Sequence, residues 1–160
     1  MKKLIYISFL LGMGFLFSCQ PEGRIYEKHK ELSPNVEWKK SDKIVFDVNI
    51  EDANTVYNQS IAFRYAYGFP YDLLKVKVTR KSPSGDVAEA VYDLLVRDEK
   101  GEYIGEAGYD IWDSEHLVET SIKFPEKGNY EFTIEPQMPD DPVPYAMEIG
   151  LVLDKVGPNH

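Results

Sequence analysis

Hydrophobic and polar residues alternate through most of the chain beyond residue 43. In the segment 44–50, for example, Ile, Phe, Val and Ile alternate with Val, Asp and Asn. Successive side chains of a β-strand point to opposite faces of a sheet, so this period of two indicates strands with one packed face and one solvated face. The alternating segments are 44–50, 57–67, 74–79, 88–96, 118–124, 130–134 and 145–153.

Short segments rich in turn-forming residues join these predicted strands. Residues 82–86 read Ser-Pro-Ser-Gly-Asp and residues 98–101 read Asp-Glu-Lys-Gly, and both compositions favour hairpin turns. We therefore predict an all-β fold, an immunoglobulin-like or jelly-roll-like antiparallel β-sandwich of about seven to nine strands. Trp38, just ahead of the first predicted strand, is expected to lie in its core.

Tyr130 stands two residues after Gly128, at the start of a predicted strand. This arrangement is typical of the tyrosine corner of immunoglobulin-like sandwiches, in which the phenol bonds back to nearby backbone. Phe132 occupies the position where antibody domains carry their second disulfide cysteine, so packing would replace that bridge here.

The N-terminus carries the pattern of a secretion signal. Two lysines precede an apolar run, residues 4–17, which is followed by Ser18 and Cys19. A basic start, a short apolar run and a small residue before the cleavage site are typical of signal peptides. At about 1.5 Å per residue, the run is too short for a hydrocarbon core of roughly 30 Å. Residues 16–19 resemble a lipobox, and Cys19 is the only cysteine, so we predict that Cys19 is lipidated.

The sequence divides into three expected regions. We expect little packing over residues 20–35, because this segment is polar, contains Pro and Gly and shows little apolar periodicity. Ile25 and Tyr26 are nevertheless apolar enough to dock on a domain. The expected regions are a signal peptide at 1–18, a lipidated N-terminus and tether at 19–35, and a β-sandwich domain at 36–160.

The chain is acidic, with a formal net charge of −9. Removal of the predicted signal peptide takes away two lysines and no acid, so the mature chain is more acidic still. Nucleic-acid binding and docking on anionic lipid both require clustered Lys and Arg. The charge therefore argues against a nucleic-acid partner, and we expect contact with the membrane through the N-terminal lipid.

Catalytic and metal-binding patterns are scarce in this sequence. A nucleophilic site needs a Ser or Cys beside a base, and among the three histidines only His116 falls well inside the predicted domain. Nucleophile-elbow and Gly-rich nucleotide motifs are absent, so we predict no enzyme and no cofactor. The His and Cys spacing predicts no zinc site. The acidic segment 110–115 lacks the glycine of a calcium loop, and no metal is expected.

Aromatic and acidic residues crowd two predicted loops. Exposed aromatics on sandwich loops anchor protein partners or stack on sugar rings, whereas buried ones belong to the core. The residues that we predict as an interaction surface are Tyr71, Tyr109, Asp110, Trp112 and Asp113. Glycan binding is the alternative function, and it needs one exposed patch made of Tyr67, Tyr71, Tyr109 and Trp112.

Several sequence blocks carry a resemblance to a known family. The most specific runs from residue 124 to 138, Phe-Pro-Glu-Lys-Gly-Asn-Tyr-Glu-Phe-Thr-Ile-Glu-Pro-Gln-Met. The others, in chain order, are 26–28 with Pro34 and Trp38, 69–73, 101–105 with 108–113, and 142–144 with Met147, Gly150 and Leu151. Together they resemble the GldH-type gliding-motility lipoproteins of Bacteroidetes over almost the whole mature chain.

This resemblance implies a lipoprotein that is needed for gliding and for the associated protein-secretion apparatus, without known enzymatic activity. Of the family's functional residues only the acylated cysteine carries over, onto Cys19. Our leading hypothesis is a noncatalytic envelope lipoprotein that contacts other motility or secretion proteins, with envelope assembly as its role in a host that does not glide. Gln20 is not the acidic retention signal of enteric bacteria, so the outer membrane is favoured over the inner membrane.

Overall fold

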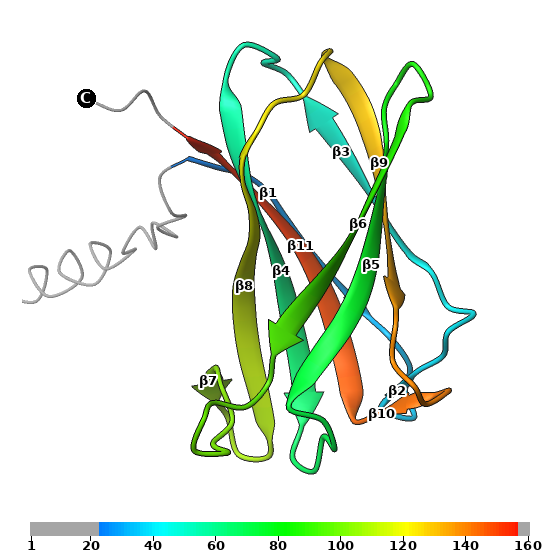
Figure 1. The fold of residues 1–160 in the computed structure, drawn as a ribbon, viewed down its shortest axis with the longest axis vertical. Coiled ribbons are helices and arrows are strands. Elements are labelled where there is room, and N and C mark those ends of the chain that lie inside the picture. The colour runs from blue at the N-terminus through cyan, green and yellow to red at the C-terminus, as the bar shows by residue number, and fades with distance from the viewer. Residues whose placement is uncertain (1–22, 157–160) are drawn as a thin grey trace, which may run out of the picture.

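The computed structural model describes residues 23–156, which form an antiparallel β-sandwich (Figure 1). Every predicted alternating segment overlaps a long strand, which confirms the all-β prediction. Residues 23–156 contain no helix long and apolar enough to cross a membrane. The strands are β1 (Arg24–Glu31), β2 (Glu37–Trp38), β3 (Ile44–Ile50), β4 (Val56–Ala66), β5 (Leu73–Lys81), β6 (Val87–Leu95), β7 (Glu106–Ala107), β8 (Ile111–Ile122), β9 (Gly128–Pro136), β10 (Val143–Pro144) and β11 (Ala146–Val156).

Two sheets face each other across the core. The first has the order β1-β11-β4-β8, with the short β7 beside β8, and the second has the order β3-β9-β5-β6. When the long strands are numbered consecutively, these orders read one-eight-three-six and two-seven-four-five. The chain crosses between the sheets at every connection between long strands except the β5–β6 hairpin, which is the double Greek key of a jelly roll. Of the two sandwich types predicted, the structure is the jelly roll.

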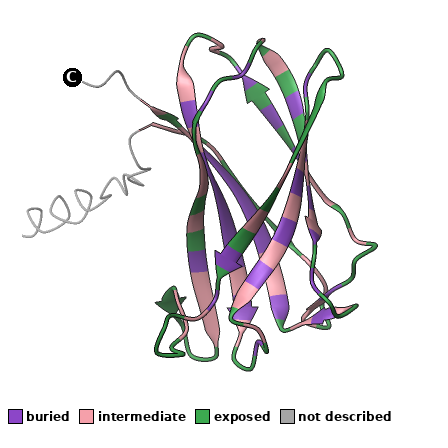
Figure 2. Cartoon of the chain, viewed as in Figure 1, coloured by how far each residue is buried: buried purple, intermediate pink, exposed green. Residues whose placement is uncertain are grey.

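The core lies between the sheets and is built from alternate residues of the strands. In β3, Phe46, Val48 and Ile50 are buried while the residues between them are exposed, as a period of two requires. β5 and β9 alternate in the same way, whereas β4 and β11, in the middle of their sheet, are buried over continuous runs (Figure 2). Trp38 is fully buried, as predicted, and its indole N–H donates to the carbonyl oxygen of Asp42 at 2.8 Å.

The expected tether differs from the structure over residues 24–31. These residues form β1, which pairs with β11 in the register His29 to Gly150 and Tyr26 to Leu153. Most of β1 is exposed, so it lacks the apolar alternation that marks strands such as β3. Tyr26 packs against the core, whereas Ile25 is 43% exposed. The predicted signal peptide and Cys19 lie outside the described residues.

β8 begins at Ile111, seven residues before the segment in which alternation predicted it. Its first half carries charged Asp113 and Glu115 beside the more buried Ser114 and His116, so polar side chains stand on both faces. Apolar periodicity cannot indicate a strand of this kind.

The tyrosine-corner contact is present although the topology is a jelly roll. The Tyr130 hydroxyl donates to the carbonyl oxygen of Glu126 at 3.0 Å. The ring of Tyr130 packs against Phe124, with ring centroids 4.8 Å apart. Sequence spacing therefore predicted this local contact correctly, while immunoglobulin topology did not follow from it.

Candidate functional site

An aromatic cluster (Tyr67, Tyr103 and Trp112) caps the end of the sandwich where β4 ends and β8 begins. The ring centroid of Tyr103 lies 4.5 Å from that of Trp112, and that of Tyr67 lies 6.0 Å from Tyr103 and 6.1 Å from Trp112. Trp112 also stacks on buried Tyr65 at 6.2 Å. Aromatic pairs at such distances contribute about 0.5–1.5 kcal/mol each beyond area burial. The cluster is thus tied directly to the core.

Arg97 holds Tyr103 in this cluster. Its guanidinium carbon lies 3.9 Å from the Tyr103 ring centroid, and its Nη2 donates to the Tyr103 hydroxyl at 2.8 Å. The same nitrogen donates to the carbonyl oxygen of Phe69 at 3.2 Å, and the Tyr103 hydroxyl also accepts the N–H of Gly68 at 2.9 Å. Sequence reasoning did not assign Tyr103 to the site, because its neighbours come from other connecting segments.

The structure brings four of the five predicted surface residues to this end. Tyr109 is 96% exposed, and exposed Asp110 follows it. The carbonyl oxygen of Asp110 accepts the N–H of Tyr67 at 2.8 Å, which joins the two loops. Trp112 is half-buried within the cluster, and Asp113 follows it on β8.

Tyr71, the fifth predicted residue, has different neighbours. Its ring packs edge-on against Phe69, with centroids 5.7 Å apart, and its hydroxyl donates to the Asp140 carboxylate. That hydrogen bond raises the pKa of Tyr71. The four aromatics of the glycan-binding alternative therefore do not form the one patch that it was expected to use.

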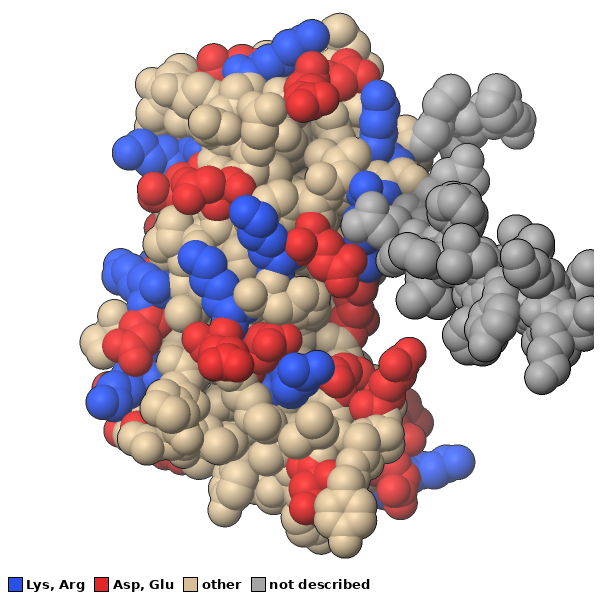
Figure 3. Space-filling model, turned by 180° about the vertical axis from the view of Figure 1, so that it is seen from behind, with Lys and Arg blue, Asp and Glu red and all other residues tan. Residues whose placement is uncertain are grey.

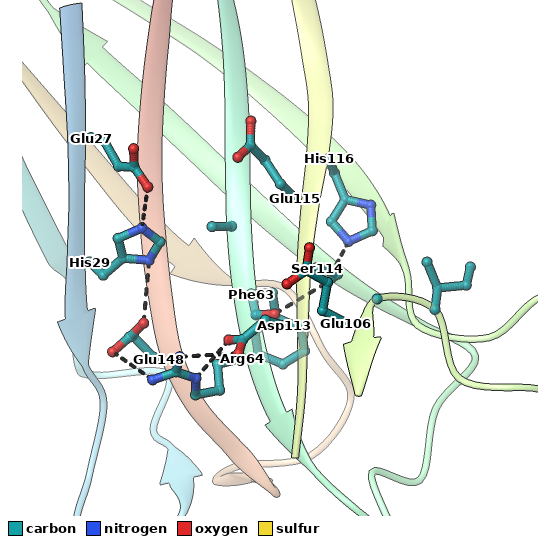
Figure 4. Close-up of a pocket in the computed structure, with 13 residues that line it drawn as sticks. Glu27, His29, Phe63, Arg64, Glu106, Asp113, Ser114, Glu115, His116 and Glu148 are labelled. Carbon is teal, nitrogen blue, oxygen red and sulfur yellow. Dashed lines mark hydrogen bonds and ion pairs between the residues drawn. The ribbon is translucent and has the colours of Figure 1, made fainter. Parts of the chain in front are cut away.

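A groove of about 590 Å³ lies on the outer face of the β1-β11-β4-β8 sheet, and Asp113 borders it (Figure 4). Its acidic side chains outnumber its basic ones, so the groove is negative. The charged and titratable residues that line it are Glu27, His29, Arg64, Glu106, Asp113, Glu115, His116 and Glu148.

Arg64 joins the two walls of this groove. Its guanidinium donates two hydrogen bonds to the Asp113 carboxylate, at 2.6 Å and 3.1 Å, and lies 3.6 Å from Glu148. Two parallel bonds fix the geometry of a carboxylate better than one. Hydrogen bonding to Asp113 accordingly raises the pKa of Arg64.

The ionic contacts continue around the groove as far as β1. His29 lies 3.3 Å from both Glu148 and Glu27, and Arg24 lies 3.0 Å from both Glu27 and Glu115. The hydrogen bond with His29 lowers the pKa of Glu27 against the opposing effect of burial. Such exposed pairs contribute about 0–1 kcal/mol each. This charge ring (Arg24, Glu27, His29, Arg64, Asp113, Glu115 and Glu148) therefore orders the groove more than it stabilises the fold.

Small residues form the floor of the groove. Gly150 on β11 lies beside Ala62 on β4, and a Cβ added to Gly150 would stand 2.6 Å from Nδ1 of His29. Real Cβ atoms do not approach other atoms so closely. Glycine at position 150 therefore lets the His29 ring lie across β11 and connect Glu27 with Glu148, as Figure 4 shows.

Ser114 and His116 form a hydrogen-bonded pair on β8. His116 Nε2 lies 3.0 Å from Ser114 Oγ, and the Ser114 hydroxyl donates to the carbonyl oxygen of Phe63 at 3.1 Å. The imidazole therefore donates to the serine oxygen. A nucleophilic serine needs the reverse arrangement, in which the histidine accepts the serine proton. This pair does not have the hydrogen-bond pattern of a catalytic dyad.

Burial lowers the pKa of His116, because desolvation disfavours the imidazolium. Below about pH 6.5 the unfolded chain therefore binds a proton at His116 that the folded protein does not yet bind. Proton binding favours the unfolded state, so the unfolding free energy decreases as the pH falls below about 6.5. We expect His116→Gln to reduce the loss of unfolding free energy between about pH 7.5 and pH 5.5, measured by urea unfolding. A loss as large as that of the wild type would contradict the prediction, and His29→Gln controls for the exposed histidine.

Acidic and basic side chains are interspersed on the face that Figure 3 shows, and no continuous basic area stands out on it. Within residues 23–156, no three His, Cys, Asp or Glu side chains are arranged to hold a metal ion.

Fold and surface together define a jelly-roll domain with an aromatic end and an adjoining charged groove. The family model described as GldH lipoprotein matches residues 24–153, from the first strand into the last. The chain therefore belongs to the GldH lipoprotein family, as the sequence blocks predicted.

Two named proteins are similar to this chain in sequence. The chain is 26% identical over 138 residues to a protein of Christiangramia forsetii named gliding motility lipoprotein GldH homolog, covering 86% of this chain and 83% of that protein. It is also 26% identical over 126 residues to the gliding motility lipoprotein GldH of Flavobacterium johnsoniae, covering 79% of this chain and 76% of that one. Both relatives are thus matched along most of their length.

Two solved structures show a looser likeness. One is a family GH115 4-O-methyl-α-glucuronidase, BtGH115A, with a TM-score of 0.42 and 12% identity, covering 86% of this chain and 18% of that chain. The other is TmCBM61 in complex with β-1,4-galactotriose, with a TM-score of 0.30 and 8% identity, covering 82% of each chain. At these TM-scores neither likeness bears on function.

Proposed function

We propose that this chain is a noncatalytic accessory lipoprotein of the gliding-motility and associated protein-secretion apparatus, and that it acts through protein–protein contacts. The observation that carries the proposal is the family match, which spans residues 24–153. The two relatives, which are matched along most of their length, are named as gliding motility lipoproteins. The Ser114–His116 hydrogen-bond pattern supports a noncatalytic role, since the serine proton is already donated to the backbone.

The proposed contact surface is the aromatic cluster with Tyr109, Asp110 and Asp113 beside it. Tyr67 is 68% exposed and Tyr109 is 96% exposed, although both are large aromatic residues. Aromatic residues are enriched among the side chains that dominate binding energy in protein interfaces. The acids that line the adjoining groove favour a partner that presents Lys or Arg to it, because opposite charges steer association and fix register.

The proposed anchor is Cys19, lipidated after removal of residues 1–18. We place the protein in the outer membrane, because Gln20 is not an acidic retention signal. One acyl chain holds a protein only marginally, whereas two or more give stable attachment. A multiply acylated cysteine would therefore keep the domain at the envelope.

A second candidate function, glycan binding at the same end, has one observation in its favour. Tyr67 and Tyr145 line an open hollow of about 400 Å³ together with Asp110. Exposed aromatic rings can stack on the apolar faces of sugars. This candidate would use Tyr145 in place of Tyr71.

The proposed function is tested by crosslinking the full-length lipoprotein in its native envelope and identifying captured proteins by mass spectrometry. Recovery of other motility or secretion components is the expected result. Recovery of outer-membrane transporters and glycan enzymes instead would contradict the proposal and favour the second candidate.

The contact surface is tested by the double variant Tyr67→Ala/Tyr109→Ala. We expect the captured motility or secretion proteins to fall about tenfold or more, which corresponds to about 1.4 kcal/mol of binding energy. The unfolding free energy should change by no more than about 1 kcal/mol, since both rings are largely exposed. Val91→Ala removes an exposed side chain from the opposite sheet and serves as the matched control. Equal capture by the double variant and this control would exclude the aromatic end as the contact surface.

A further inference from the structure

A cleft of about 220 Å³ opens between the two sheets at the edge formed by β6 and β8. β7 pairs only with Trp112 and Asp113, so the second half of β8 is a free edge of its sheet. The cleft therefore reaches between the sheets, whereas the charged groove lies on the outer face of one of them. Residues that line it include Gln59, Arg80, Ala88, Ala90, Tyr92 and Glu119.

Gln59 lines this cleft and carries a buried amide nitrogen without a hydrogen-bond partner among the described residues. The residue is 1% exposed, and among residues 23–156 its Nε2 has no hydrogen-bond acceptor. A buried polar group left unpaired destabilises the folded state, and such groups are few in native proteins. Residues 23–156 thus supply no hydrogen-bond acceptor for the amide N–H groups of Gln59, and a bound ligand could supply one.

The pairing of β4 with β8 is irregular at Gln59. The ladder between β4 and β8 shifts register on both sides of Gln59, between Tyr57 and Gln59 and again before Ser60. Irregularities of this kind re-aim side chains and are frequent beside functional sites. Here the irregularity places Gln59 opposite Glu119, the other polar residue of the same wall.

Among the remaining polar groups of the cleft, Tyr92, Arg80 and Glu119 are paired with one another, while Glu89 accepts a hydrogen bond from Thr79 and pairs with Lys77. The Tyr92 hydroxyl donates to the Glu119 carboxylate at 3.0 Å, and Arg80 lies 3.7 Å from the same carboxylate. Burial first, and then the hydrogen bond to Glu119, raise the pKa of Tyr92 to about 12, so its hydroxyl stays protonated. The cleft thus presents donors from Gln59 and Arg80 and acceptor capacity at Glu119 and Tyr92.

Small residues keep the cleft open. Ala90 pairs with Val78 across the β5–β6 ladder, and Val78 is only 4% exposed, so Ala90 faces the opposite sheet. Ala88 pairs with Arg80 and shares that face. A larger apolar residue at position 90 would fill the space and bury more area, which is the usual solution in a sandwich core.

We propose that this cleft binds one sugar residue of a glycan, with Gln59 donating to a ring or hydroxyl oxygen. Sugar hydroxyls both donate and accept hydrogen bonds, which matches the mixed donors and acceptors of the cleft. The Arg80–Glu119 pair balances its own charge, and Glu89 is paired with Lys77 at 3.6 Å, so a neutral ligand fits better than an ionic one. The C–H face of a sugar ring would lie against Val78 and Ala90.

Binding is tested with the full-length lipoprotein in detergent micelles. It is titrated calorimetrically with the methyl glycosides of galactose, glucose, mannose, rhamnose and N-acetylglucosamine. We expect at least one to bind in about the millimolar range. Gln59→Leu should weaken that binding about tenfold or more, and Ala90→Leu should abolish it by filling the cleft. Val91→Ala, on the opposite face of the same strand, should bind as the wild type does.

A stability measurement separates a binding role of Gln59 from a structural one. Gln59→Leu removes an unpaired buried amide, so we expect its thermal unfolding midpoint to rise while glycoside binding falls. A lower midpoint would show that Gln59 holds the fold together, and would overturn the proposal. Failure of all five glycosides to bind the wild type, or binding unaffected by Ala90→Leu, would also overturn it. These outcomes leave the crosslinking test of the proposed function untouched.

Discussion

Trp38→Ala is expected to cost about 3–5 kcal/mol of unfolding free energy, the range for truncation of a buried aromatic side chain. Trp38 is 0% exposed, and its indole N–H bonds to the Asp42 carbonyl oxygen at 2.8 Å. It also pairs with Val143 in the β2–β10 ribbon. The substitution therefore opens a cavity and leaves the Asp42 carbonyl without its donor. Because domains are stable by only about 5–15 kcal/mol, the variant should be close to unfolding at physiological temperature.

Trp112→Ala is the matched control, since these are the two tryptophans of the chain. Trp112 is half-buried and contacts Tyr65 and Tyr103, so we expect a cost of about 1–2 kcal/mol. Urea unfolding followed by circular dichroism measures both variants on one scale. Equal losses for Trp38→Ala and Trp112→Ala would show that position 38 is not the central packing residue described above.

Cys19→Ser is expected to abolish lipid attachment and to release the domain from the membrane fraction. Without a thiol no thioether to diacylglycerol can form, and an anchor of two or three acyl chains contributes about 0.8 kcal/mol per buried methylene. The measurement is metabolic labelling with palmitate, together with fractionation of the envelope. Ser18→Ala keeps a small residue before the cleavage site and should be labelled normally. Wild-type labelling of Cys19→Ser would refute the proposed anchor.

The strands with one buried and one exposed face could be predicted from the sequence, because burial on one face imposes a period of two. β3 is the clearest case, with Phe46, Val48 and Ile50 buried and their neighbours exposed. β1 could not be predicted in this way. It is an edge strand whose residues are mostly exposed, so its place is set by backbone pairing with β11 and not by an apolar face.

Local contacts within the site could be predicted better than contacts between distant segments. The sequence predicted one interaction surface from neighbouring residues, namely Tyr109, Asp110, Trp112 and Asp113. The place of Tyr103 depends on Arg97 and on the loop at Gly68, which the fold brings together. No sequence motif distinguishes Gln59 or Gly150 from other residues of their strands.

For these residues the role depends on topology. The unpaired amide of Gln59 can be recognised only once the packing of the two sheets at the β6–β8 edge is known. The small size of Gly150 matters only when His29 is placed across β11. No pattern along the sequence contains this information, since each case joins strands far apart in the chain.

The antiparallel pairing of β1 with β11 has a mechanical consequence. Arg24 pairs with Asp154 at one end of this sheet, whereas the aromatic cluster lies at the other end, where Tyr65 pairs with Ala146 and Trp112 (Figure 1). A partner held at the aromatic end and a lipid held through the N-terminus would pull the domain along its strands. Such a load shears all β1–β11 hydrogen bonds together, where a pull across the strands would open them one by one. The ladder from Arg24 to Glu31 would thus act as a force-bearing joint between membrane and partner.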